Sequence, residues 1–107
     1  MTTSKPPLPA GSKPEALRLR PKVDLVASTV EAQRGAMMKA LENNSSPVVL
    51  DLAEVDLLDS LGITLVLGLF KTCQKGGASF AIEGVKPDIM RVFRLLNLPK
   101  FFSITEA

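Results

Sequence analysis

The chain has no histidine, tryptophan or tyrosine, and only one cysteine, Cys73, among its 107 residues. Without histidine it lacks the commonest general base near neutral pH, and without tryptophan and tyrosine it lacks many nucleic-acid stacking groups. A single cysteine cannot form an internal disulfide, and a zinc site built from cysteine and histidine is excluded. These absences argue against a metal cofactor and fit a reducing compartment.

Long hydrophobic runs and nucleotide-binding motifs are missing as well. The N-terminus has no apolar signal-peptide core, and the longest uncharged apolar run, residues 60–70, is far too short for a membrane span. Neither Gly-x-Gly-x-x-Gly nor the P-loop pattern occurs. We therefore predict a cytoplasmic protein that is not an enzyme, does not insert into a membrane and needs no cofactor.

The first residues differ in composition from the rest. Residues 1–15 contain four prolines and are predicted to form a flexible leader, followed by a single domain over residues 16–107. Residues 1–22 carry five basic residues against Glu15, a balance of +4, so the remainder carries −2 within the total of +2. Because the basic residues are dispersed, we expect a solvated tail and no direct nucleic-acid binding.

Alternating strand and helix signals predict an α/β fold with a central mixed, mostly parallel sheet and helices packed on it. Strands are expected over residues 16–20, 47–52, 78–83 and 101–104. Helices are expected from a capping box at residues 28–31, from the apolar run 60–75, and from Pro87, with Ile89, Val92, Phe93 and Leu96 facing inward. The almost continuously apolar segment 47–52 is typical of a strand covered on both faces.

The element Asp59-Ser60-Leu61-Gly62 lies where a buried strand gives way to a helix. A serine there either caps the helix or offers a phosphorylation site, since free N–H groups and the helix dipole favour an anion. Gly62 costs about 1 kcal/mol relative to alanine in a helix and leaves room for another backbone or a kinase. The residues alone leave both interpretations open.

Acidic residues recur before this element and raise the question of a magnesium site. They are Asp51, Glu54, Asp56 and Asp59. Side chains along a strand and its exit loop diverge, so we predict a solvated or backbone-bonded loop and no metal site. The lone Cys73, late in an apolar helix, is predicted to serve packing.

Residues 48–63, VVLDLAEVDLLDSLGI, resemble the core signature of STAS domains, which include bacterial anti-sigma factor antagonists and domains of sulphate transporters. The resemblance extends over residues 16–107. Further matches are Val23-Asp24, Gly76-Gly77, Gly84-Val85-Lys86-Pro87, Leu95-Leu96-Asn97-Leu98 and Phe101-Phe102.

The resemblance implies an anti-sigma factor antagonist that binds a serine kinase, itself the anti-sigma factor, and is released when that kinase phosphorylates Ser60. A phosphatase would reverse the step. Asp24 and Asp59 match acidic positions that the family uses for recognition by the kinase. The predicted contact surface comprises Asp24, Asp59, Ser60, Leu61, Gly62 and Ile63.

Some residues depart from the family pattern and leave a second interpretation open. Leu61 replaces the small hydroxylated residue that often follows the phosphoserine, and the proline-rich leader replaces a first strand. The alternative is a STAS accessory subunit of a membrane transport complex that is not phosphorylated. Such members often carry threonine or another residue at the switch position, so Ser60 argues against this alternative.

Overall fold

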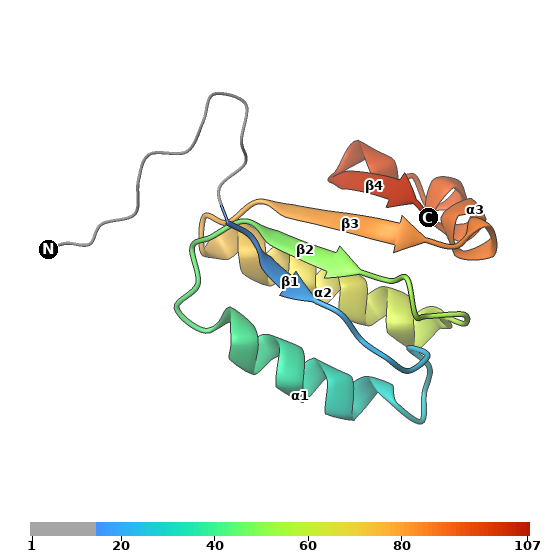
Figure 1. Cartoon of the computed structure of the whole chain (residues 1–107), viewed down its shortest axis with the longest axis horizontal. Coiled ribbons are helices and arrows are strands. Elements are labelled where there is room, and N and C mark those ends of the chain that lie inside the picture. The colour runs from blue at the N-terminus through green and yellow to red at the C-terminus, as the bar shows by residue number, and fades with distance from the viewer. Residues whose placement is uncertain (1–14) are drawn as a thin grey trace, which may run out of the picture.

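The computed structural model describes residues 15–107, so residues 1–14 of the predicted leader lie outside the described part of the chain. The elements follow one another as β1 (Leu17–Leu19), α1 (Val30–Leu41), β2 (Val48–Asp51), α2 (Ser60–Lys75), β3 (Phe80–Val85), α3 (Pro87–Leu95), the 3-10 helix η1 (Leu98–Lys100) and β4 (Ser103–Glu106). Figure 1 shows their arrangement, with the N-terminal end of β1 far from the C-terminus.

The strands form one sheet in the order β1-β2-β3-β4, and each pairing is parallel. Parallel neighbours need a crossover that carries the chain back to the same end of the sheet, and a helix supplies each crossover here. The predicted α/β fold is confirmed. The sheet is parallel throughout the described strands rather than mixed.

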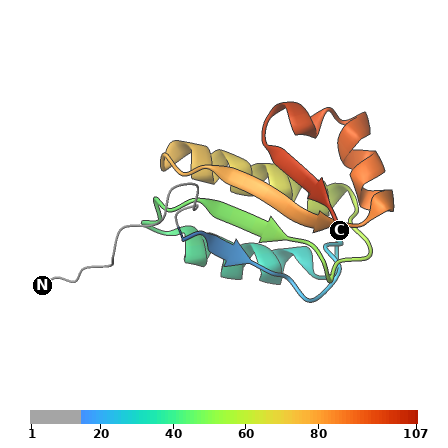
Figure 2. The same ribbon diagram turned by 45° about the horizontal axis from the view of Figure 1, so that its top comes forward.

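Helices α1 and α2 lie on the same side of the sheet (Figures 1 and 2). Successive strands are added in one direction, and crossovers of one hand then place their helices on one face. In β2, Val48 and Leu50 belong to the core under the helices, whereas Val49 and Asp51 alternate onto the opposite face. All four residues of β2 are buried, as expected for a strand covered on both faces, although α1 and α2 lie on only one of those faces (Figures 1 and 2).

Helix α2 is apolar around most of its circumference because it lies between other elements. On one side Thr72 lies 3.6 Å from the sulfur of Met38 in α1. On the other side the ring of Phe70 lies 5.0 Å from that of Phe102. Consequently, within residues 61–70 only Leu61 remains exposed among the large apolar side chains.

The start of α1 differs from the predicted capping box. The helix begins at Val30 after Thr29, and no side chain caps it. The hydroxyl of Thr29 instead accepts the N–H of Val26 at 3.1 Å and donates to the carbonyl of Asp24. A hydroxyl that bonds its own preceding turn is not available to the first helical N–H groups.

The C-terminal elements also differ in detail from the prediction. Strands β3 and β4 begin two residues later than expected, and η1 lies before β4. Helix α3 buries Ile89, Met90 and Phe93, while Val92 and Leu96 are exposed. At 100° per residue, positions 89, 90 and 93 share one stripe, and all three residues belong to the hydrophobic core.

Candidate functional site

Two loops run side by side at the carboxyl end of the sheet, one after β1 and one after β2. Leu25 and Leu58 pair as an isolated parallel bridge. The N–H of Leu25 donates to the carbonyl of Leu57 at 3.0 Å, and the N–H of Asp59 donates to the carbonyl of Leu25 at 3.2 Å. These bonds extend the β1–β2 pairing beyond the regular strands, up to the residue that precedes α2.

The side chain of Asp24 strengthens the same junction. Its Oδ1 accepts the N–H of Asp56 at 2.9 Å and the N–H of Leu57 at 3.1 Å. One carboxylate oxygen thus binds two successive backbone donors of a loop that is 32 residues away in sequence. Asp24 holds the β2–α2 loop in place, and only the folded chain reveals this partner.

Asp59, and not Ser60, caps α2. Its Oδ1 accepts the N–H of Leu61 at 2.9 Å and that of Gly62 at 3.0 Å, which satisfies two of the unpaired donors at the helix start. Its Oδ2 accepts the N–H of Ala27 at 2.9 Å from the other loop. These bonds, the one from Gly62 foremost, lower the pKa of the Asp59 carboxyl below its ordinary value of 3.8.

Because Asp59 caps α2, the Ser60 hydroxyl does not cap the helix. Ser60 is the first residue of α2 and is exposed. Its carbonyl accepts the hydroxyl of Thr64 at 3.0 Å. Its own hydroxyl makes no hydrogen bond with any other residue in the described range 15–107. Of the two interpretations that the sequence left open, capping by Ser60 is therefore wrong.

Gly62 is required by the close contact between the two loops. A Cβ at this position would lie 2.3 Å from the carbonyl oxygen of Leu25 and 2.9 Å from Cγ of Leu58. The space that the missing side chain leaves is filled by the chain's own backbone, and Gly62 is buried. Gly62 therefore allows the two loops to pack together beneath the predicted contact surface, and as a buried residue it is not part of that surface.

Exposed aliphatic side chains lie close to Ser60 in the sequence and on the adjoining β1–α1 loop. Leu57 is 62% exposed, Leu61 45% and Val23 41%, while Ile63 is half-buried. Leu61 and Ile63 were predicted as contact residues, but Val23 and Leu57 were not. A signal was present in the adjacent pair Leu57-Leu58: two successive leucines before a helix cap point in different directions, and only one can enter the core.

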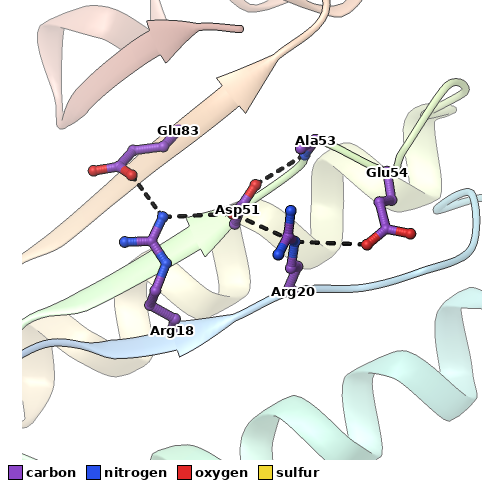
Figure 3. Close-up of polar contacts among 6 residues, drawn as sticks. All are labelled: Arg18, Arg20, Asp51, Ala53, Glu54 and Glu83. Carbon is purple, nitrogen blue, oxygen red and sulfur yellow. Dashed lines mark hydrogen bonds and ion pairs between the residues drawn. The ribbon is translucent and has the colours of Figure 1, made fainter.

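The remaining acidic residues pair with basic side chains, and Asp51 and Glu54 share Arg20. Asp51 is 8% exposed, and its Oδ1 accepts the N–H of Ala53 at 3.0 Å. Its Oδ2 lies 3.4 Å from Nη2 of Arg18 and 3.6 Å from Nε of Arg20. Figure 3 shows this cluster on the sheet face that the helices leave bare, with α2 behind. The turn at Ala53 directs the chain away from β2 and into the loop that leads to Ser60.

Asp56 and Glu54 form ion pairs with basic side chains. Asp56 pairs with Lys86, which precedes α3, and Glu54 lies 3.6 Å from Arg20. Within residues 15–107 no group of three or more acidic, cysteine or histidine residues lies close enough to hold a metal ion. The acidic residues of the β2 end and its exit loop thus serve to fasten loops and strands.

A concavity of about 490 Å³ lies on the bare sheet face, lined by Ala16, Arg18, Val49, Ala81 and Glu83 among others. Its lining residues lie near the amino ends of the strands, whereas Ser60 lies beyond their carboxyl ends. The two features are therefore separate. In the described part of the chain, no helix is both long and apolar enough to cross a membrane.

Comparison with known proteins agrees with this architecture. The family described as "STAS domain" matches residues 9–107, and the chain belongs to that family. An anti-sigma factor antagonist candidate from Thermotoga maritima shares the fold with a TM-score of 0.77 at 21% identity, over 86% of this chain and 80% of that one. An anti-sigma-factor antagonist (STAS) domain protein from Planctomyces limnophilus has a TM-score of 0.68 at 20% identity, over 84% and 74% of the two chains.

Proposed function

We propose that this STAS domain is a phosphorylation-switched binding protein of the anti-sigma factor antagonist type. In its unphosphorylated form it binds an anti-sigma factor that is also a serine kinase, and phosphorylation of Ser60 releases it. A phosphatase resets the cycle. The observation that carries the proposal is the exposed Ser60 hydroxyl, which is free because Asp59 caps the helix in its place.

A phosphate at Ser60 is compatible with the fold. The hydroxyl has no hydrogen bond to another described residue that modification would break. The phosphate would lie at the positive end of the α2 dipole, which stabilises negative charge. The modification therefore acts on the surface that the partner contacts and leaves the domain folded.

The same phosphate is incompatible with a close apolar contact. It adds a charge of about −1.5 to −2 at neutral pH, next to the Asp59 carboxylate. Leu57 and Leu61 flank the site, and a partner that covers them would have to desolvate the phosphate as well. Loss of the complex on phosphorylation follows from that cost together with like-charge repulsion.

Phosphate transfer tests the assignment of the site. The purified kinase with ATP should add one phosphate to wild type and none to Ser60→Ala, as read by intact-protein mass spectrometry. Thr64→Ala is the matched control, because Thr64 is an exposed hydroxyl one helical turn away. It should accept one phosphate as wild type does. Phosphate on Ser60→Ala would overturn the assignment.

Affinity tests the switch itself. Titration of the kinase with Ser60→Asp should show weaker binding than titration with wild type, while the two proteins unfold at similar urea concentrations. Equal affinity of the two would overturn the proposal that the phosphate acts at the interface.

A further inference from the structure

Large apolar side chains that remain exposed in residues 15–107 fall into two groups. Val23, Leu57 and Leu61 lie on the joined loops and the first turn of α2. A second group of Val92, Leu95, Leu96 and Phe101 lies on α3 and around η1. The first group contains Leu57 and Leu61, which lie within three residues of Ser60, the residue on which the proposed kinase must act. A kinase that reaches the Ser60 hydroxyl therefore comes close to Leu61, the next residue on the first turn of α2.

Two members of the aliphatic group, Leu57 and Leu61, lie on hydrogen-bonded backbone. Leu57 has its N–H bound by Asp24 and its carbonyl bound by the N–H of Leu25. Leu61 has its N–H bound by Asp59. A side chain on an ordered backbone loses less entropy on binding than one on a loose loop, so these leucines suit an interface.

The two carboxylates nearby are occupied by the protein itself. Asp59 accepts three backbone N–H groups, from Leu61, Gly62 and Ala27. Asp24 accepts two, from Asp56 and Leu57. Each bond lies between 2.9 and 3.1 Å, and each carboxylate bridges segments that the sequence separates widely. Each carboxylate therefore already holds backbone of its own chain in place.

We infer that the partner recognises the Ser60 site through an aliphatic surface made of Val23, Leu57 and Leu61, and that Asp24 and Asp59 are positioning residues that hold this surface in place. The occupant is a complementary apolar face of the kinase. This inference rests on the proposed function for the identity of the partner. It assigns Asp24 and Asp59, which the family resemblance implied are needed for recognition by the kinase, an indirect role in that recognition.

Asp24 allows the two roles to be separated by paired substitutions. Asp24→Asn removes the charge but keeps an Oδ1 that can accept the N–H groups of Asp56 and Leu57. Asp24→Ala removes both the charge and the acceptor. A positioning role predicts affinity within about twofold of wild type for the asparagine variant and a marked loss for the alanine variant, because only the latter loosens the loop.

Hydrogen exchange provides a readout that does not depend on the partner. The amides of Asp56 and Leu57 should exchange faster in Asp24→Ala and at the wild-type rate in Asp24→Asn, since exchange follows local opening. Urea unfolding of both variants shows whether the domain remains folded under the binding conditions.

The aliphatic surface is tested with a matched pair of exposed leucines. Leu57→Ser should lower the affinity for the purified kinase by about tenfold, as truncation of an interface anchor does, without shifting the urea midpoint. Leu95→Ser, at a leucine that is 76% exposed in the second group, should leave the affinity unchanged.

The outcomes separate this inference from the proposed function. Full affinity of Leu57→Ser, or equal losses in Asp24→Asn and Asp24→Ala, would overturn the inference. If Leu57→Ser weakens binding but Ser60→Asp does not, the aliphatic surface stands and the phosphorylation switch fails. If Ser60→Asp weakens binding and Leu57→Ser does not, the phosphorylation switch stands and the aliphatic surface fails.

Discussion

Replacement of Gly62 by alanine should destabilise the domain, although alanine is the better helix former. The added Cβ would lie 2.3 Å from the carbonyl oxygen of Leu25, whereas real Cβ contacts are essentially never shorter than 3.0 Å. The oxygen and the helix must therefore separate by at least 0.7 Å, the difference between the two distances. Because the obstacle is backbone, no side-chain rotation can relieve it.

The magnitude follows from three contributions. Overpacking of this kind costs about 1–3 kcal/mol. The Leu25 carbonyl also accepts the N–H of Asp59 at 3.2 Å, and losing that bond costs about 1 kcal/mol. The helix propensity of alanine returns about 1 kcal/mol. We expect a net loss of about 2 kcal/mol in the free energy of unfolding, within the range that the overpacking cost sets.

Urea unfolding followed by circular dichroism measures this loss. With a slope of about 1–3 kcal/mol per molar urea, a loss of about 2 kcal/mol lowers the midpoint by roughly 0.7–2 M. Gly35→Ala is the matched control: Gly35 lies within α1, and its Cβ would meet nothing within 4 Å. That variant should gain up to about 1 kcal/mol from helix propensity. If both variants are stabilised, the close approach of the two loops is refuted.

Two further predictions concern the cap and the core. Asp59→Ala should be less stable than wild type above pH 3.8. Because folding lowers the pKa of this carboxyl, the difference in stability should shrink as the pH falls from 3.8 through the folded-state pKa. Urea midpoints of both proteins from pH 7 to pH 2.5 test this sign. A constant difference would contradict the cap. Phe93→Ala should cost about 3–5 kcal/mol because the ring is fully buried, whereas Phe101→Ala, at a ring that is 62% exposed, should change the thermal midpoint little. Similar effects of the two substitutions would contradict the assignment of the core.

Composition and periodicity were sufficient for the class of fold. The apolar segment around Val48 and Leu50, the glycine pair after Lys75 and the proline at position 87 mark elements that the structure contains. Their spacing requires helical crossovers, which only a largely parallel sheet accommodates. Errors arose at element ends, such as the start of α1, where Thr29 binds a preceding turn instead of the helix.

Local sequence was less informative about the bare sheet face. An apolar strand such as β2 is compatible with helices on one face or on both, because Val49 is buried although it lies on the face opposite α1 and α2. Which faces are covered depends on the hand and direction of every crossover together. The position of Asp51 beneath Arg18 and Arg20 likewise depends on strand neighbours that lie more than 30 residues apart.

The sequence by itself determined that residues 59–62 form a strand-to-helix junction with a serine at the helix start, since these features depend on neighbouring residues. Tertiary structure decided what each residue there does. Asp59 is the cap, Ser60 is left exposed, and Gly62 admits the Leu25 carbonyl because the β1–α1 loop packs against this junction. That loop lies about 30 residues away in sequence, so no local pattern contains the contact.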